Sequence, residues 1–132
     1  MPYIHIQISG EENSDLAARV TERAVELTAT LLGKNRALTA VVIDFIEATH
    51  YWSIGGLPLR AGGPRSYHWE VSVTDETNTK REKALYLQAV HEAMGALLGG
   101  VAEHSYAHVA DLRGSAYGYG GRTQEDRYQH SS

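Results

Sequence analysis

The segment PYIHIQI, residues 2–8, alternates apolar and polar side chains directly after the first methionine. Its three isoleucines lie on one side of an extended strand, because successive side chains on a strand point to opposite faces. The segment YHWEVSV, residues 67–73, shows the same alternation at an offset of 65 positions. The sequence therefore predicts two related strands and a duplicated chain.

An amphipathic helix is predicted after each strand. Its apolar positions are spaced by four, three and four residues, and they return at an offset of 66. This spacing gathers the apolar side chains into one stripe on a helix. The matched positions are Val20, Ala24, Leu27 and Leu31 in the first half, and Tyr86, Val90, Ala93 and Leu97 in the second.

Capping residues set the expected helix ends. Ser14-Asp15 is typical of a helix start, and Thr79 with Glu82 forms a capping-box pattern. Gly33 and Gly99 are expected to end the two helices. We therefore expect helices of about eighteen residues.

A second apolar run follows each helix, at residues 40–46 and more weakly at residues 106–110. Each half then reads as strand, helix, strand, and a helical crossover makes the two strands parallel with a right-handed connection. One such unit cannot bury both its helix stripe and its sheet face. We expect an α/β fold of two tandem β-α-β units, with a four-stranded sheet, two helices on one face, and an apolar opposite face packed on another subunit.

The whole chain, residues 1–132, is expected to be a single domain of two fused repeats. The first repeat spans residues 2–56 and the second spans residues 67–121, and each closes with an aromatic and glycine turn. Residues 57–66, rich in glycine and proline, form the expected connector. The polar tail, residues 122–132, is expected to be partly disordered.

Composition excludes several function classes. The chain has no cysteine, which excludes disulfides, thiolate metal sites and a cysteine nucleophile. A formal net charge of -4 offers no overall attraction to nucleic acid. No apolar run approaches the ~20 residues of a membrane span. We expect a cytoplasmic protein with neither nucleic-acid nor membrane partners.

Pro2 is the first candidate catalytic residue. Methionine is normally removed before a small residue, which would leave Pro2 as a free secondary amine. An α-amino group titrates near ~8, and burial or a neighbouring cation lowers its pKa toward neutrality. There the amine can accept and return protons. If Met1 stays attached, Pro2 is a tertiary amide without basicity.

The first half resembles the 4-oxalocrotonate tautomerase (4-OT) family. The resemblance rests on Pro2, Leu32-Gly33-Lys34-Asn35, Val41-Val42-Ile43-Asp44 and Trp52-Ser53-Ile54-Gly55-Gly56. The duplication resembles the fused members of that family, and the two halves together cover about residues 2–121. The resemblance implies a proline base in an apolar pocket, no cofactor, and assembly as a homotrimer.

The resemblance also implies the reaction. A cofactor-independent tautomerase would move a proton between oxygen and carbon of a small 2-hydroxydienoate, enol or 2-oxo acid. One alternative is a related hydratase, dehalogenase or decarboxylase acting on a three-carbon acid, which would use a protonated proline together with arginines. Another is a catalytically silent oligomeric binding protein that has kept the scaffold.

The chain departs from the best-known members where they carry arginines. Here those stretches are Glu11-Glu12-Asn13 and Val41-Val42. Another cation must then hold a substrate carboxylate, and the candidates are Arg81 and Arg60. Arg81 lies in a basic first helical turn, where the helix dipole disfavours positive charge, and Arg60 lies in the connector. The alternative for both is a solvated surface residue, which is the more common role of such arginines.

Two further side chains are candidates for substrate binding. Trp52 matches the aromatic position that the family places beside the proline, and it can form an apolar wall or fill a subunit interface. His108 is a candidate hydrogen-bond donor in the pocket. His104 and His108, four apart on a strand, share a face and Asp111 follows, but the family chemistry needs no metal and we expect none.

Overall fold

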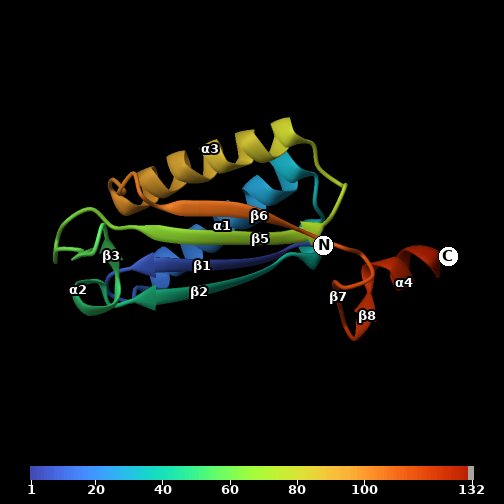
Figure 1. Cartoon of the computed structure of the whole chain (residues 1–132), viewed down its shortest axis with the longest axis horizontal. Coiled ribbons are helices and arrows are strands. Elements are labelled where there is room, and N and C mark those ends of the chain that lie inside the picture. Colours follow the sequence, from blue (N-terminus) through green and yellow to red (C-terminus); the bar gives the residue numbers. More distant parts are fainter. Residues whose placement is uncertain (131–132) are drawn as a thin grey trace.

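The structure, a computed structural model, describes residues 1–130 and contains one four-stranded sheet in the order β2-β1-β5-β6 (Figure 1). Strand β1 (Tyr3–Ser9) is parallel to β2 (Ala40–Ile46), and β5 (Tyr67–Thr74) is parallel to β6 (Tyr106–Leu112). Strands β1 and β5 are antiparallel neighbours and join the two units. The predicted pair of β-α-β units in one sheet is confirmed.

Helices α1 (Ser14–Leu32) and α3 (Lys80–Leu98) each contain 19 residues. Both end at the predicted glycines, since Gly33 has φ 67° and Gly99 has φ 71°. These left-handed conformations carry little cost for glycine, which has no Cβ. Both helices cover the same face of the sheet (Figure 1).

The helix starts agree with the sequence in one case and differ by a residue in the other. Thr79 and Glu82 form the predicted capping box at the start of α3. At α1 the N-cap is Asn13, whose side chain accepts a hydrogen bond from the Leu16 amide at 3.0 Å. The expected cap at Ser14-Asp15 was therefore wrong by one position, because asparagine is as good a cap as serine or aspartate.

The core lies between the helices and one face of the sheet. Alternate residues of the two central strands point into it, and all six are at most 1% exposed. They are Ile4, Ile6, Ile8, Trp69, Val71 and Val73. The predicted helix stripes meet them, with Val20 and Ala24 from α1 and Val90 from α3 fully buried.

One buried polar group joins three elements of this core. The Tyr86 hydroxyl of α3 accepts a hydrogen bond from Trp69 Nε1 at 3.0 Å and lies 2.9 Å from Thr28 Oγ1 of α1. Buried polar groups are costly unless they are paired. This network therefore fixes how α1, α3 and β5 pack together.

Short elements lie beyond both ends of the sheet (Figure 1). They are η1 (Arg36–Leu38), α2 (Ala48–Tyr51), β3 (Ser53–Ile54), β4 (Leu57–Pro58), β7 (Gly118–Tyr119), β8 (Arg122–Thr123) and α4 (Gln124–Gln129). Strand β4 lies in the expected connector and pairs with β3. Within the predicted tail, residues Gln124–Gln129 form the helix α4, which Thr123 caps, while Ser131 and Ser132 lie outside the described residues.

The open face of the sheet, which the helices do not cover, is more polar than expected. Its exposed large apolar side chains are those of Tyr3, Val42, Tyr106 and Leu112. Between them lie histidine, glutamine and acidic side chains: His5, Gln7, Asp44, His68, Glu70 and His108. The expected apolar face is found only in part. Among the described residues, no helix has the length and apolar character needed to cross a membrane.

Candidate functional site

Pro2 lies at the end of the sheet where β1 and β2 begin and β5 and β6 end. We call this the proline end, and Figure 1 shows the N-terminus there. Pro2 is buried, and its carbonyl oxygen accepts a hydrogen bond from the Ala40 amide at 3.2 Å. The parallel pairing of β1 with β2 therefore holds the residue in place.

Lys34 is the cation that acts on the terminal amine. Burial and then the positive charge of Lys34 lower the pKa of the Met1 amine from its ordinary value. Lys34 Nζ donates a hydrogen bond to Thr77 Oγ1 at 2.9 Å, and burial lowers the pKa of Lys34 too. The loop after α1 thus supplies a positively charged group at the proline end.

Tyr117 contributes a hydroxyl at the same end. Its oxygen lies 2.6 Å from the Met1 carbonyl oxygen and 3.0 Å from the Ser72 carbonyl oxygen. Burial raises the pKa of Tyr117, so the hydroxyl keeps its proton at neutral pH. It is therefore a hydrogen-bond donor beside the first two residues of the chain.

A pocket of about 470 Å³ opens at the proline end. Met1 and Lys34 line it together with residues from the end of β5 and from the C-terminal segment, including Asp75, Gln124 and Tyr128. The Met1 sulfur accepts a hydrogen bond from Gln124 Nε2 at 3.1 Å. The residue joined to the Pro2 nitrogen thus forms part of a pocket wall.

Sequence reasoning missed both Lys34 and Tyr117 as candidate site residues. A signal existed for Lys34. It follows Gly33, where α1 ends, and the chain then enters β2, whose first residue pairs with the first residue of β1. Lys34 is therefore expected near the start of β1. For Tyr117 the signal was the repeat, since it matches Trp52 at an offset of 65. Because β1 and β5 are antiparallel, the aromatic residue of the second unit lies at the proline end of the first.

Trp52 lies at the opposite end of the sheet from Pro2 within one chain. It lines a pocket of about 810 Å³ together with Tyr67, His68 and His108. Tyr67 occupies the position that matches Pro2 in the repeat. The structure therefore brings two candidates, Trp52 and His108, together, but around the second unit's first strand.

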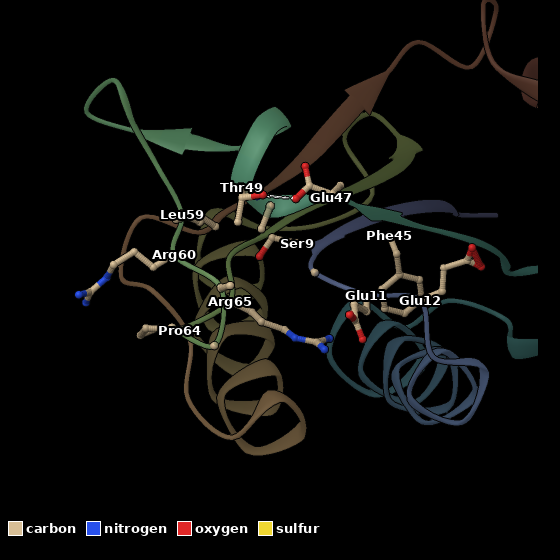
Figure 2. A pocket seen from close by; sticks show the side chains of 15 residues that line it. Ser9, Glu11, Glu12, Phe45, Glu47, Thr49, Leu59, Arg60, Pro64 and Arg65 are labelled. Carbon is tan, nitrogen blue, oxygen red and sulfur yellow. Dashed lines mark hydrogen bonds between the residues drawn. The ribbon is translucent and has the colours of Figure 1, made fainter.

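Arg81 and Arg60 are both exposed and lie apart from each other. Arg81 is in the first turn of α3, which begins at the proline end (Figure 1). Arg60 lines a pocket of about 660 Å³ beyond the other end of β1, with Glu11 and Arg65 among its neighbours. Figure 2 shows Arg60 extending away from this pocket while Arg65 extends toward Glu11. Arg60 is thus remote from Pro2 within one chain.

The histidines lie differently from the arrangement that the sequence suggested. Asp111 binds Lys83 of α3, with 2.6 Å between carboxylate oxygen and Nζ, so it lies on the helix side of β6. His108 lies on the open face and close to His68 and Glu70 of β5. Among the described residues, these three side chains form the one group with metal-ligand spacing.

Comparison with known proteins gives relatives by sequence and by fold. No protein-family model matches the chain. A relative named probable tautomerase K2, from Dickeya dadantii (strain 3937), is 41% identical over 61 residues, which is 42% of this chain and 84% of the relative. The match is about the length of one repeat.

Solved structures share the fold at low identity. A native fused 4-OT has a TM-score of 0.76 at 17% identity, covering 93% of this chain and 96% of that one. A fused 4-OT symmetric trimer has a TM-score of 0.80 at 14% identity, and the match covers 94% of this chain and 97% of that one. A macrophage migration inhibitory factor-like protein from Entamoeba histolytica has a TM-score of 0.75 at 13% identity, covering 92% and 97%.

Proposed function

Since this chain belongs to the 4-OT-like group of the tautomerase superfamily, we propose that it moves a proton between oxygen and carbon of a small enol or 2-oxo acid, with Pro2 as the proton carrier. The observation that supports this most is the environment at the chain start. Pro2 is buried, and burial and Lys34 lower the pKa of the Met1 amine, which belongs to the residue joined to the Pro2 nitrogen. An amine that is neutral near pH 7 is both a competent base and, once protonated, a competent acid.

The reaction requires removal of Met1, which lines the pocket, and this removal frees the Pro2 nitrogen to which Met1 is joined. The nitrogen then takes the hydroxyl proton of the enol, and the same proton is returned to the substrate carbon as the carbonyl forms. No proton or electron is gained or lost overall. The step needs neither metal nor cofactor from the chain.

Lys34 and Tyr117 supply the other two requirements of the reaction. The Lys34 ammonium binds a substrate carboxylate, taking the place of the arginines that this chain lacks. The Tyr117 hydroxyl, no longer bound to the Met1 carbonyl, donates to the oxygen on which negative charge develops. Arg81, in the first turn of α3, is the second candidate for the carboxylate.

We propose a homotrimer as the working assembly. One solved structure with the same fold is a fused 4-OT trimer. In this chain the open face of the sheet exposes large apolar side chains, including Tyr3 and Tyr106, which another copy could cover. Within one chain Trp52 is at the wrong end of the sheet to contact Pro2. Its role as the apolar wall of the proline pocket therefore requires Trp52 of a neighbouring copy.

The test compares wild type and Pro2→Ala as catalysts of phenylenolpyruvate and 2-hydroxymuconate ketonisation, with intact mass measured on both. We expect wild type to lack Met1, and Pro2→Ala to lose about 10²- to 10⁴-fold in kcat/KM with unchanged folding. Equal rates in the two proteins would contradict the proposal. Retained Met1 on an inactive wild type would favour the silent binding protein instead.

A further inference from the structure

Two histidines and a glutamate, side chains of types that can bind metals, meet on the open face of the sheet. His68 and Glu70 are two residues apart on β5 and so point to the same side. His108 on β6 is the direct partner of Glu70 in the parallel register. One ligand atom from each side chain lies within 4.8 Å of the other two.

We propose that His68, Glu70 and His108 bind a divalent transition-metal ion of the zinc type. Two imidazole nitrogens and one carboxylate oxygen form a donor set that zinc and its first-row neighbours prefer. Calcium and magnesium prefer sites made of oxygen ligands alone. The ligand chemistry therefore selects the class of ion.

The spacing of the ligands fits such an ion. His108 Nε2 and Glu70 Oε2 are 3.3 Å apart. In a tetrahedral site with metal–ligand bonds of about 2.0–2.1 Å, neighbouring ligand atoms are about 3.3–3.4 Å apart. The His68 and His108 ring centres are 5.4 Å apart, so both rings are near the same point and small side-chain rotations complete the site.

Gln7 on β1 orients His68, one of the proposed ligands, through a hydrogen bond. Its Oε1 lies 3.2 Å from His68 Nδ1, and it can accept a proton from that nitrogen. This bond favours the tautomer in which His68 Nε2 carries the lone pair, which is the usual second contact of a metal-binding histidine. The open face therefore contains a supporting contact as well as the ligands.

Two of the three side chains, the histidines, line a pocket. His68 and His108 line the pocket of about 810 Å³ that also contains Trp52 and Tyr106. A water or a small ligand on the ion would enter from there. Within one chain the site lies on a different part of the sheet from Pro2, although in the proposed trimer the Trp52 of this pocket lies beside Pro2 of a neighbouring copy. Metal binding is measured without using the proposed reaction as its readout.

The test is metal binding by the full chain after treatment with a chelator. We expect one Co²⁺ ion per chain, seen as the visible absorption of a tetrahedral site, and its displacement by Zn²⁺. His68→Ala and His108→Ala should each weaken Zn²⁺ binding at least about 100-fold, and Gln7→Ala about 10-fold. Zn²⁺ should raise the unfolding temperature of wild type but not of these two histidine variants.

The matched control is His50→Ala, because His50 is an exposed histidine that also pairs with a carboxylate, Glu47, at 2.9 Å. This variant should bind Zn²⁺ as wild type does. An equal loss of affinity in His50→Ala would overturn the proposal. Unchanged affinity in folded His68→Ala and His108→Ala, or absence of binding by wild type, would overturn it too.

Discussion

The Tyr117 hydroxyl oxygen lies 2.6 Å from the Met1 carbonyl oxygen, although the two residues are 116 positions apart. This contact joins the closing turn of the second unit to the first residues of the first unit. It follows from the antiparallel pairing of β1 and β5, which brings the end of each unit to the start of the other.

Tyr117→Phe tests whether that hydroxyl takes part in catalysis. The ring and its packing remain, but the donor for the developing oxyanion is lost, so kcat should fall about 10²-fold while the unfolding temperature changes little. Steady-state kinetics and thermal unfolding measure the two effects. Tyr119→Phe, in the neighbouring hairpin, is the control and should keep wild-type kcat. An unchanged kcat in Tyr117→Phe would show that the hydroxyl takes no part in catalysis and that the role of Tyr117 is structural.

Lys34 has two expected effects that a pH profile separates. Its positive charge lowers the pKa of the Met1 amine, and we expect the same effect on the Pro2 amine once Met1 is removed. Lys34→Ala should therefore raise the pKa of the Pro2 amine and move the rising limb of the kcat/KM profile to higher pH. The lost charge-assisted contact, worth about 1.5 kcal/mol, also raises KM for carboxylate substrates about 10-fold. Lys34→Arg keeps the positive charge, so the rising limb of its kcat/KM profile should lie at the same pH as in wild type.

Arg81→Ala provides the comparison for that experiment. Arg81 is exposed at the start of α3, so its removal should raise KM less than removal of Lys34. If Arg81→Ala raises KM more than Lys34→Ala does, the carboxylate is bound by the helix turn and the assignment of Lys34 is wrong.

A shared site between copies predicts recovery of activity on mixing. Pro2→Ala and Trp52→Ala are each expected to be impaired as pure proteins. After joint unfolding and refolding, about one proline site in four of a randomly mixed trimer combines an intact Pro2 with an intact Trp52 of the next copy. Activity well above that of either parent supports the trimer, whereas the simple average of the parents contradicts it.

The buried network around Tyr86 predicts a stability effect without loss of chemistry. Tyr86→Phe leaves Thr28 and Trp69 Nε1 without their partner, which costs about 1–3 kcal/mol in the free energy of unfolding. Urea unfolding measures this, and Tyr51→Phe, whose side chain is 78% exposed, should be neutral. An equal effect of the two substitutions would show that the network adds nothing to stability.

The fold followed closely from local patterns. The alternation of residues 2–8 and the stripe that includes Val20 and Val90 gave the correct elements, because burial against a single core imposes those periods. The tail helix α4 was missed although Thr123 accepts a hydrogen bond from the Asp126 amide in a recognisable cap. Its signal was short and lay in a polar segment.

The surroundings of Pro2 were harder to predict from sequence. Lys34 and Tyr117 reach it only through the pairing of strands, and strand order depends on how two units dock rather than on any local pattern. The same holds for Glu70 and His108, which become neighbours through the parallel register of β5 and β6. Spacing along the chain had instead grouped His108 with Asp111.

The most direct test is an NMR titration of the Pro2 nitrogen in ¹⁵N-proline-labelled protein. We expect a single amine resonance whose pKa lies below the ordinary value of about 8 for an α-amino group, and an increase in that pKa in Lys34→Ala. A pKa at or above that value, or a nitrogen that does not titrate because Met1 is still attached, would contradict the proposal that Pro2 is the base.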